Sequence, residues 1–312
     1  MKTRHNTTRR RLLIAGAAAA ATAALPTTSF ADTEEAPLQT RRIPVSGEAF
    51  PVVGIGTAVI FDFENDAAKY ADRRSVIQTL VAGGGKLIDT AHSYGSAEER
   101  VGALVTDIGV RERLFLATKF SYGNSREAAV DSMQNSLRRL KTSSVDLMQA
   151  WNVADPNYDL GLLREWKRQG LCRYTGMTIS QTRSYEAIGK VLTREKPDFF
   201  QVNYSLGDRA AEERLLPAAH DAGAAVLINL PFGRNSLFKK SAGKPLPGFA
   251  AEIGAISWAQ IFLKFILSHP AVTAVIPGTD KAEYMRDNLN AGRGVMPDAA
   301  MRRRIIEYWE TL

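Results

Sequence analysis

Three side chains that could act together in a proton transfer lie within one stretch of the sequence. Asp89 and Lys119 each end an apolar run, and Tyr94 lies in the polar segment between the two runs. A phenol has an ordinary pKa of about 10, and a neighbouring ammonium lowers it by stabilising the phenolate. A carboxylate beside that ammonium keeps it charged and in place. The set therefore indicates a general acid or base at Tyr94, with a structural Lys–Asp pair and a packing tyrosine as the alternative.

The elements that would hold these side chains alternate regularly along the chain. Eight apolar runs with strand character are separated by amphipathic stretches with helical periodicity. The expected strands are residues 52–56, 86–89, 114–119, 145–151, 172–177, 199–203, 225–229 and 272–276. The expected helices are residues 75–82, 97–106, 126–140, 160–169, 185–192, 210–222, 258–267 and 281–289. This alternation predicts a closed parallel (β/α)8 barrel of the TIM-barrel type.

Two further segments lie outside the eight repeats. Residues 42–48 have the composition of a hairpin turn that could plug one end of the barrel. In the tail, Met301, Ile305 and Trp309 recur every four residues, which predicts an extra C-terminal helix packed on the barrel. We expect one domain over residues 32–312. An open doubly wound sheet is the second possibility, and the lack of a GxGxxG motif after the first expected strand weighs against it.

The N-terminal residues predict export from the cytoplasm. Arg9, Arg10 and Arg11 precede a short alanine-rich apolar run, and Ser29-Phe30-Ala31 supplies small residues before the next acidic residue. This pattern resembles a twin-arginine signal peptide over residues 1–31, cleaved after Ala31, with an uncleaved anchor or a basic tail as the alternative. We expect transient contact with the twin-arginine export machinery and a periplasmic or otherwise exported mature protein. Once the signal is removed, no membrane association is expected.

The formal charge of +7 does not indicate a nucleic-acid-binding protein. Residues 1–31 contain five basic residues and no acidic one, so the mature chain keeps a net charge of only +2. That balance lacks the basic stripe that binding to a phosphate backbone requires. The one cysteine, Cys172, is expected in the core, and the four histidines are widely separated. No cluster of metal ligands results, so we expect no metal site.

Several short motifs, in the same order along the chain, resemble the signature of the aldo-keto reductase superfamily. The most specific one is LIDTAHSYGSAE, residues 87–98. Residues 54–57, 117–119, 145–149, 200–204 and 276–279 also match, and together the motifs span residues 42–292. The resemblance implies NAD(P)H-linked interconversion of a carbonyl group and an alcohol on a (β/α)8 barrel. The partner would be a small aldehyde, ketone, sugar or alcohol.

The resemblance also implies roles for individual residues. Tyr94 would be the proton donor, Lys119 its activator, and Asp89 the partner of Lys119. The nicotinamide end of the cofactor would be surrounded by Gly56, Thr57, Thr178 and Gln201. The rest of the cofactor groove would be lined by Phe232, Gly233, Gly278, Thr279 and Asn288. In that groove, the helix after the last strand would offer free N–H groups to a phosphate.

The cofactor motifs depart from the family pattern. Ile179 stands in place of the asparagine that binds the carboxamide, and Asn229 in place of the aromatic residue that stacks on the nicotinamide. In the phosphate loop, a lysine and an arginine of the family are replaced by Gly278 and Tyr284. These losses weaken a 2′-phosphate site, although two basic residues, Lys281 and Arg286, lie near enough to compensate. We therefore expect NADP or NAD as the cofactor.

The catalytic motif departs from the family pattern at Trp151, where the family usually has a histidine. An indole N–H donates one hydrogen bond and accepts none, so Trp151 could polarise a carbonyl but could not relay a proton. It could also serve as a stacking platform for a sugar or aromatic ring, or simply fill the site. Loss of one oriented donor lowers a rate by ~10²–10³. We count Trp151 with the catalytic residues and expect an oxidoreductase. The alternative is a weakened or inactive barrel that binds a cofactor or a partner.

Overall fold

The strands of the chain lie side by side in sequence order around a barrel. The computed structural model describes residues 36–121 and 125–312, of which Ala36–Leu312 form one compact unit. Eight parallel strands run in the order β3 (Ile55–Gly56), β4 (Leu87–Asp89), β5 (Phe115–Phe120), β6 (Val145–Ala150), β7 (Cys172–Ile179), β8 (Phe199–Asn203), β9 (Ala225–Asn229) and β10 (Ala274–Val275). Parallel bridges join Val53 to Val275 and Gly56 to Gly278, so the first strand also meets the last. The predicted barrel is confirmed, and the open doubly wound sheet is excluded.

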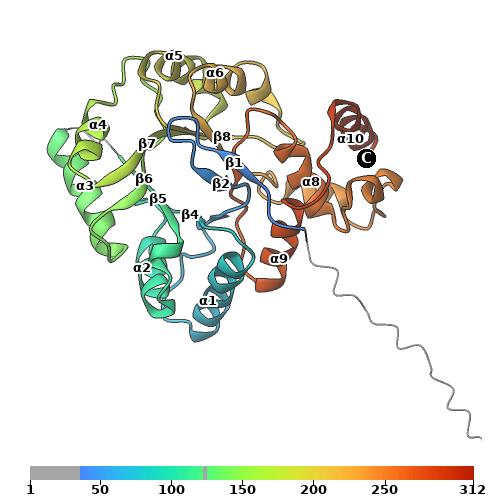
Figure 1. Cartoon of the computed structure of the whole chain (residues 1–312), viewed down its shortest axis with the longest axis horizontal. Coiled ribbons are helices and arrows are strands. Elements are labelled where there is room, and N and C mark those ends of the chain that lie inside the picture. The colour runs from blue at the N-terminus through green and yellow to red at the C-terminus, as the bar shows by residue number, and fades with distance from the viewer. Residues whose placement is uncertain (1–35, 122–124) are drawn as a thin grey trace, which may run out of the picture. The chain divides into compact units, whose positions relative to one another are not determined.

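Helices surround this ring of strands, as Figure 1 shows in a view down the barrel. They are α1 (Ala67–Ala82), α2 (Ala97–Ile108), α3 (Arg126–Arg139), α4 (Gly161–Arg168), α5 (Tyr185–Glu195), α6 (Leu215–Asp221), α8 (Trp258–Leu267) and α9 (Ala282–Ala291). Short 3-10 turns occur at η1 (Arg111–Arg113), η2 (Thr182–Ser184) and η3 (Ala210–Glu212). In the described parts of the chain, no helix combines the length and the apolar character needed to cross a membrane. The predicted signal peptide, residues 1–31, lies outside the described residues.

Some element boundaries differ from the predicted ones for identifiable reasons. Helix α1 begins well before residue 75 because the Asp66 carboxylate accepts the backbone N–H of Lys69 at 3.0 Å and caps the helix there. The predicted helix 210–222 is divided into η3 and α6. Pro217 lacks an N–H group and therefore fits only in the first turn of a helix, which α6 provides. The predicted strand 145–151 ends one residue early, so Trp151 lies just beyond β6.

The segment after β9 contains elements that the sequence pattern did not predict. Helix α7 (Ser236–Ser241) and the 3-10 helix η4 (Gly248–Ile253) lie between β9 and α8, where no helix was predicted. The predicted C-terminal helix is present as α10 (Ala299–Thr311), with Ile305 and Trp309 buried. The ring centroid of Trp309 lies 5.5 Å from that of Phe262 in α8, so α10 packs as its periodicity indicated.

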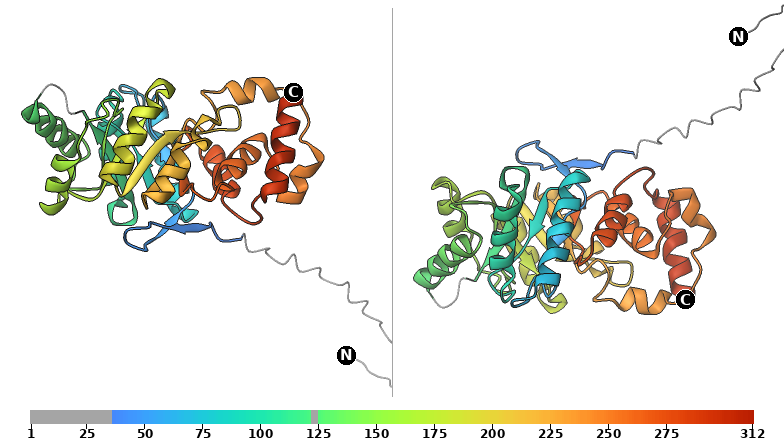
Figure 2. Two further views of the ribbon diagram at one scale, coloured as in Figure 1. Left: turned by 90° about the horizontal axis from the view of Figure 1, so that it is seen from above. Right: turned by 90° about the horizontal axis from the view of Figure 1, so that it is seen from below.

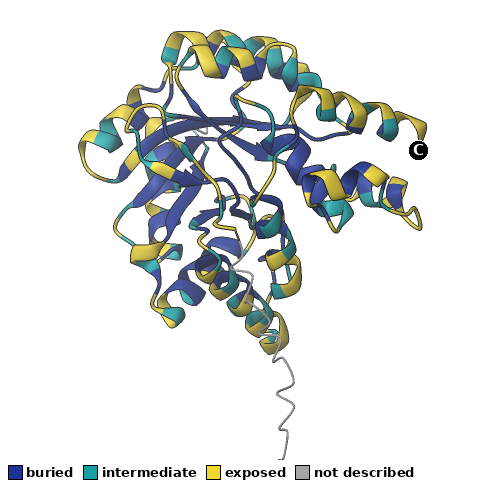
Figure 3. Cartoon of the chain, turned by 45° about the vertical axis from the view of Figure 1, so that its right-hand side comes forward, coloured by how far each residue is buried: buried dark blue, intermediate teal, exposed yellow. Residues whose placement is uncertain are grey.

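The buried residues form two layers because successive strand side chains point to opposite faces. One cluster fills the inside of the barrel and includes Leu87, Phe115, Leu147, Phe199 and Leu227. A second cluster lies between the strands and the helices and includes Ile88, Leu116, Met148, Phe200 and Ile228. Figure 3 shows the strands as buried and the outer faces of the helices as exposed. Cys172, expected in the core, is buried in the outer cluster.

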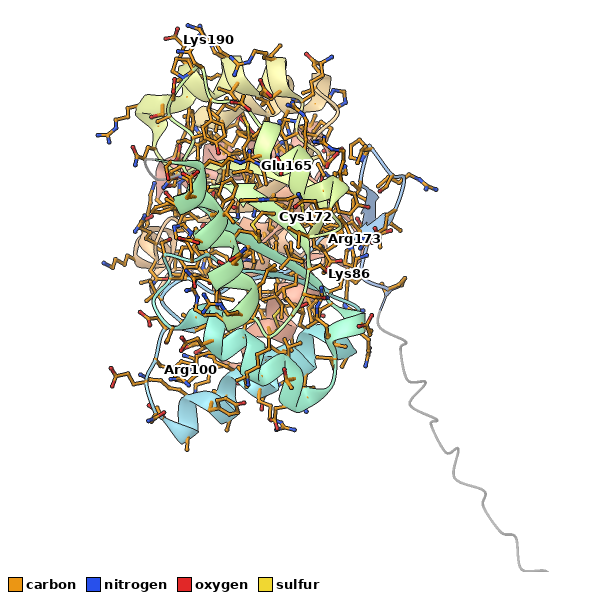
Figure 4. The ribbon with its side chains drawn as sticks, turned by 90° about the vertical axis from the view of Figure 1, so that its left-hand side faces the viewer. Lys86, Arg100, Glu165, Cys172, Arg173 and Lys190 are labelled. Carbon is orange, nitrogen blue, oxygen red and sulfur yellow. The ribbon has the colours of Figure 1, made fainter. Side chains whose placement is uncertain are left out.

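A hairpin closes one end of the barrel, as predicted (Figure 2). Strands β1 (Thr40–Arg42) and β2 (Ala49–Pro51) pair antiparallel, and the Phe50 ring lies edge-on to Phe115 at 4.8 Å. Glu48 accepts from the Lys86 ammonium at 2.5 Å and from the Arg173 guanidinium at 2.7 Å. Figure 4 shows Lys86 and Arg173 on the side of the barrel that faces the hairpin. Because these two residues lie at strand beginnings, the hairpin covers the amino ends, and the carboxyl ends remain for a site.

Candidate active site

The Asp89 carboxylate is the centre of a buried polar network at the carboxyl ends of the strands. Its Oδ2 accepts a hydrogen bond from Lys119 Nζ at 2.5 Å and from Gln201 Nε2 at 3.2 Å. Its Oδ1 accepts from Gln149 Nε2 at 3.0 Å. Four strands, β4, β5, β6 and β8, therefore each contribute one side chain to the network. The structure brings together three residues that were predicted for the site, Asp89, Lys119 and Gln201.

Strand alternation explains why these polar side chains meet. Leu87, Leu147 and Phe199 fill the interior of the barrel, and the residues two positions later in the same strands are Asp89, Gln149 and Gln201. Side chains two positions apart in a strand share a face. The register places Lys119 of β5 next to Gln149 of β6, at the same level as this polar layer. The network is thus the top layer of the barrel interior.

Lys119 is held in its charged form within this layer. Its side chain is only 2% exposed, and Nζ also donates to the Thr90 carbonyl oxygen at 2.8 Å. Burial acts to lower the pKa of the ammonium, but the Asp89 carboxylate and the Tyr94 oxygen outweigh it and raise the pKa above its usual value. Lys119 Nζ lies 5.1 Å from the centroid of the Tyr94 ring. A permanent positive charge therefore lies directly beside the phenol.

The loop that carries Tyr94 is fixed by contacts with the loop after β3. The Asp62 carboxylate accepts from the Ser96 backbone N–H at 2.9 Å and from its hydroxyl at 3.0 Å. Gly95 has a φ of +55°, and a Cβ there would lie 2.3 Å from the Asp62 carboxylate, so only glycine fits. Tyr94 itself is half-buried. These contacts hold the turn that places the Tyr94 ring beside Lys119.

Trp151 directly follows β6 at the mouth of the barrel, whereas the sequence pattern had placed it as the last residue of that strand. Its backbone N–H donates to the Phe120 carbonyl at 3.0 Å, which continues the pairing of β6 with β5. The next residue, Asn152, has a φ of +50°, and its Oδ1 accepts from the backbone N–H and hydroxyl of Ser180. Trp151 is 37% exposed, which is unusual for so large an aromatic side chain. It is not a core residue.

His92 contacts Trp151 from the loop after β4. The two ring centroids are 5.3 Å apart and the planes are inclined by 87°, an edge-to-face arrangement. His92 Nδ1 lies 3.1 Å from the Lys119 carbonyl oxygen, which requires a proton on Nδ1. Burial lowers the pKa of this imidazole, so it is neutral at pH 7.

The carboxyl ends of β6, β8 and β9 carry buried hydrogen-bond acceptors that have no partner within the described residues. Asn203 and Asn229 are neighbours in the register of β8 and β9. Within the described residues, four side-chain carbonyl oxygens are buried and accept no hydrogen bond, those of Gln149, Gln201, Asn203 and Asn229. Buried acceptors without a donor are costly, and this wall of the site therefore fits a ligand with N–H groups, such as a carboxamide.

The predicted residues of β7 face different sides of the barrel wall. Thr178 is buried beside Gln201 in the register and shares its inward face. Ile179, the next residue, is fully buried in the outer cluster between strands and helices. The replacement of a polar residue by Ile179 is thus accommodated by packing, because this side chain points away from the mouth.

The predicted residues near β3 and β10 form a tight backbone junction. A Cβ on Gly56 would lie 2.8 Å from the Ile276 carbonyl oxygen, so only glycine allows the two strands to approach. Thr57 is buried and its hydroxyl donates to the Asp89 carbonyl oxygen at 3.1 Å. Gly278 follows β10, and the Thr279 hydroxyl accepts from Asn288 Nδ2 at 2.9 Å. These contacts hold the loop before α9 in place.

The basic residues near α9 are not all available for a phosphate. Lys281 Nζ lies 2.6 Å from an Asp72 carboxylate oxygen, and this contact raises the pKa of Lys281. Arg286, the other residue predicted to compensate, is exposed. In the segment after β9, Gly233 has a φ of +55°, and the Phe232 ring packs against that of Phe238 at 4.8 Å. Phe232 therefore packs against α7.

Sequence reasoning missed three residues of this site, His92, Gln149 and Asn203. Gln149 and Asn203 lie inside matched motifs, two positions after inward-facing residues, and the strand period alone could have placed them. His92 was considered only as a metal ligand. In the described ranges, 36–121 and 125–312, no group of three potential metal ligands occurs.

Comparison with known proteins identifies related sequences. The model of the Aldo/keto reductase family matches residues 52–304. Methylglyoxal reductase YeaE of Escherichia coli is 29% identical over 252 residues, which cover 76% of this chain and 84% of the relative. Aldo-keto reductase str7 of Strobilurus tenacellus is 26% identical over 297 residues, covering 82% and 87% of the two chains.

A solved structure has the same fold. The crystal structure of an aldo-keto reductase from Klebsiella pneumoniae in complex with NADPH superposes with a TM-score of 0.73. The match covers 87% of this chain and 95% of that one, at 23% identity. At this identity the comparison establishes the shared barrel fold and leaves the chemistry to the residues themselves.

Proposed function

Because this chain belongs to the aldo/keto reductase family, we propose that it interconverts a carbonyl group and an alcohol with NADP or NAD. The observation that carries the proposal is the buried Lys119–Asp89 pair beside the Tyr94 phenol. A nicotinamide bound at the mouth would supply the hydride. The unused acceptors on Gln201, Asn203 and Asn229 fit the N–H groups of its carboxamide. Aldo-keto reductases of similar fold have been solved with NADPH or NADP, which also supports the cofactor class.

In the proposed reaction, Tyr94 donates its hydroxyl proton to the carbonyl oxygen during reduction. The Lys119 ammonium stabilises the phenolate that remains, and Asp89 holds the ammonium in place. Gln149 and Gln201 each donate to Asp89, so the carboxylate keeps one orientation throughout. In the oxidation direction the phenolate accepts the proton of the alcohol.

Trp151 changes how the substrate carbonyl is held. One indole N–H can donate to the carbonyl oxygen, but the residue cannot pass on a proton. We propose an active reductase whose rate is below that of family members with the histidine. Trp151 also favours the second candidate, a barrel that binds cofactor or partner without efficient turnover. The complete Asp89, Tyr94 and Lys119 set argues for the reductase, since an inactive barrel has no need of it.

A single-turnover experiment tests the proposal. Mature protein is mixed with NADPH or NADH and then with a panel of aldehydes and ketones. The panel includes methylglyoxal, the substrate in the name of the Escherichia coli relative. The near-ultraviolet absorbance of the reduced nicotinamide reports hydride transfer. We expect decay with at least one substrate. No decay with any substrate, together with no gain in Trp151→His, would support the non-catalytic barrel instead.

We also propose that the protein is exported through the twin-arginine pathway with its cofactor bound. The support is the run Arg9-Arg10-Arg11 before an alanine-rich segment, together with the cofactor motifs of the folded barrel. Reduced nicotinamide is expected to be scarce outside the cytoplasm, so a retained cofactor would be regenerated by alternating substrates. Cell fractionation of the wild type and of Arg10→Lys/Arg11→Lys tests export. Nucleotide analysis of the periplasmic protein tests retention, and empty protein would contradict it.

A further inference from the structure

The contact between His92 and Trp151 joins two loops that are not neighbours around the barrel. Trp151 follows β6 and His92 follows β4, whereas β5 lies between these strands in the sheet. The edge-to-face contact at 5.3 Å therefore brings the two rings together across the end of β5. The last inward side chain of β5 is Lys119. The two rings thus meet at the carboxyl end of β5, the strand that carries Lys119.

The His92 ring is also held by the backbone of β5. Its Nδ1 donates to the Lys119 carbonyl oxygen at 3.1 Å, so the ring is tied to the strand that carries the ammonium. This bond leaves Nε2 as an acceptor and sets the plane of the imidazole. The Trp151 side chain is exposed, and its position after β6 does not fix the direction in which the indole points. Among the aromatic side chains of the described residues, the His92 ring is the one that contacts this indole.

We propose that His92 is a positioning residue that holds the Trp151 indole over the Lys119–Asp89 pair. We also propose that the fixed indole selects carbonyl compounds with a flat aromatic or unsaturated group next to the carbonyl. A rigid indole stacks on a planar group with little loss of conformational freedom, and a small aliphatic chain gains little from it. The substrate class rests on the proposed reductase function, whereas the positioning of Trp151 does not.

A fluorescence experiment tests the positioning without any turnover. The Trp151 signal is obtained as the difference between each protein and the same protein carrying Trp151→Phe. In His92→Gln, which keeps a donor but loses the ring, we expect quenching of this signal by acrylamide to rise about twofold. In His92→Phe, which keeps the ring, quenching stays near the wild-type value. His220→Phe, at an exposed histidine, is the control. Unchanged quenching in His92→Gln would overturn the proposal.

Steady-state kinetics with benzaldehyde and propanal test the substrate class. We expect His92→Gln to raise KM for benzaldehyde about two- to tenfold, with a smaller effect on kcat. Trp151→Ala should raise this KM by a similar factor and, because it also removes the indole N–H, should lower kcat for both aldehydes. The KM of the double variant for benzaldehyde should be no higher than that of Trp151→Ala, because both changes remove the same stacking surface. His92→Phe should restore most of the benzaldehyde affinity, and in His92→Gln the KM for propanal should change less than twofold.

The two experiments separate the possible failures. Equal effects of His92→Gln on the KM for benzaldehyde and for propanal would overturn the proposed substrate class, even if quenching shows that His92 holds the indole. Failure of the wild type to reduce either aldehyde, or any other member of the panel, would contradict the proposed reductase function. In that case the quenching result alone still decides whether His92 positions Trp151.

Discussion

Lys119 and Asp89 form an ion pair of 2.5 Å in which each side chain is 2% exposed. An enclosed pair of this kind contributes little net stability, because both charges lose their hydration. Its consequence is local, since it keeps a positive charge beside the Tyr94 ring where water cannot screen it. Two glutamines complete the hydrogen bonding of the carboxylate. The main effect of the Lys119–Asp89 pair is therefore on the Tyr94 phenol and not on the stability of the fold.

Replacing Asp89 by Asn should affect both activity and stability. The substitution leaves the Lys119 ammonium buried without a counter-charge, which costs about 3–5 kcal/mol of unfolding free energy. We expect kcat to fall by roughly 10²-fold or more, because a displaced or neutral lysine no longer stabilises phenolate. Urea unfolding and steady-state kinetics measure the two effects. Asp107→Asn, which removes an exposed pair with Arg74, should cost no more than about 1 kcal/mol. Equal costs for the two variants would contradict this account.

Replacing Trp151 by His should increase the rate with small substrates. An imidazole can donate and accept, and its smaller ring relieves crowding over Lys119. We expect kcat for a short aliphatic aldehyde to rise by roughly tenfold, less than the ~10²–10³ of a whole oriented donor, because the indole already supplies one N–H. Trp151→Phe removes the donor without adding another and serves as the control. A rise in both variants would attribute the effect to space rather than to hydrogen bonding.

The pairing of Lys281 with Asp72 predicts a change in cofactor preference. The contact of 2.6 Å occupies the ammonium nearest the predicted phosphate loop. Asp72→Asn should release Lys281 and lower Kd for NADPH by about two- to fivefold, the range of a partly exposed pair, with little change for NADH. Fluorescence titration with both nucleotides measures this. The variant Asp72→Asn/Lys281→Met should lose the gain, and persistence of the gain there would show that Lys281 is not involved.

The buried side chain of Lys264, which lies outside the site, leads us to predict that the unfolding free energy depends on pH. Its ammonium is buried, donates to the carbonyls of Arg293 and Val295, and burial lowers its pKa to about 8. In the unfolded chain the pKa is about 10.4, so between these values the unfolded state holds the proton more tightly. The unfolding free energy should therefore rise by about 2–3 kcal/mol as pH increases through this window.

Urea unfolding at several pH values checks the Lys264 prediction. The slope should disappear in Lys264→Met and remain in the exposed control Lys239→Met. Loss of the two hydrogen bonds will lower the stability of Lys264→Met at every pH, so the slope, not the absolute value, is the result that counts. Parallel curves for wild type and Lys264→Met would refute the prediction.

Strand periodicity and motif order were sufficient to predict the barrel, its plug and the polar layer that contains Asp89 and Lys119. Asp89 and Lys119 end apolar runs in adjacent strands, and parallel strands bring their carboxyl ends to one edge. The short elements α7 and η4 were not predictable, because six residues are too few to establish a helical period. Their positions depend on tertiary packing.

The contact of His92 with Trp151 could not be predicted from the sequence either. Both residues follow their strands, and spacing gives no information about which way a loop side chain turns. The indole has to reach across β5 to meet the imidazole, and only the three-dimensional arrangement of the loops determines that. Asn203 differs, since its inward direction follows from Phe199 and Gln201 in the same strand.

Hydride transfer in Tyr94→Phe tests the central claim most directly. This change removes the proposed proton donor and leaves Lys119, Asp89 and the cofactor groove intact. With saturating NADPH and the best aldehyde of the panel, the account predicts a single-turnover rate about 10²–10⁴ times lower. It also predicts that NADPH affinity stays close to the wild-type value and that Tyr70→Phe, on the outer helix α1, has the wild-type rate. A Tyr94→Phe rate equal to that of the wild type would contradict the account.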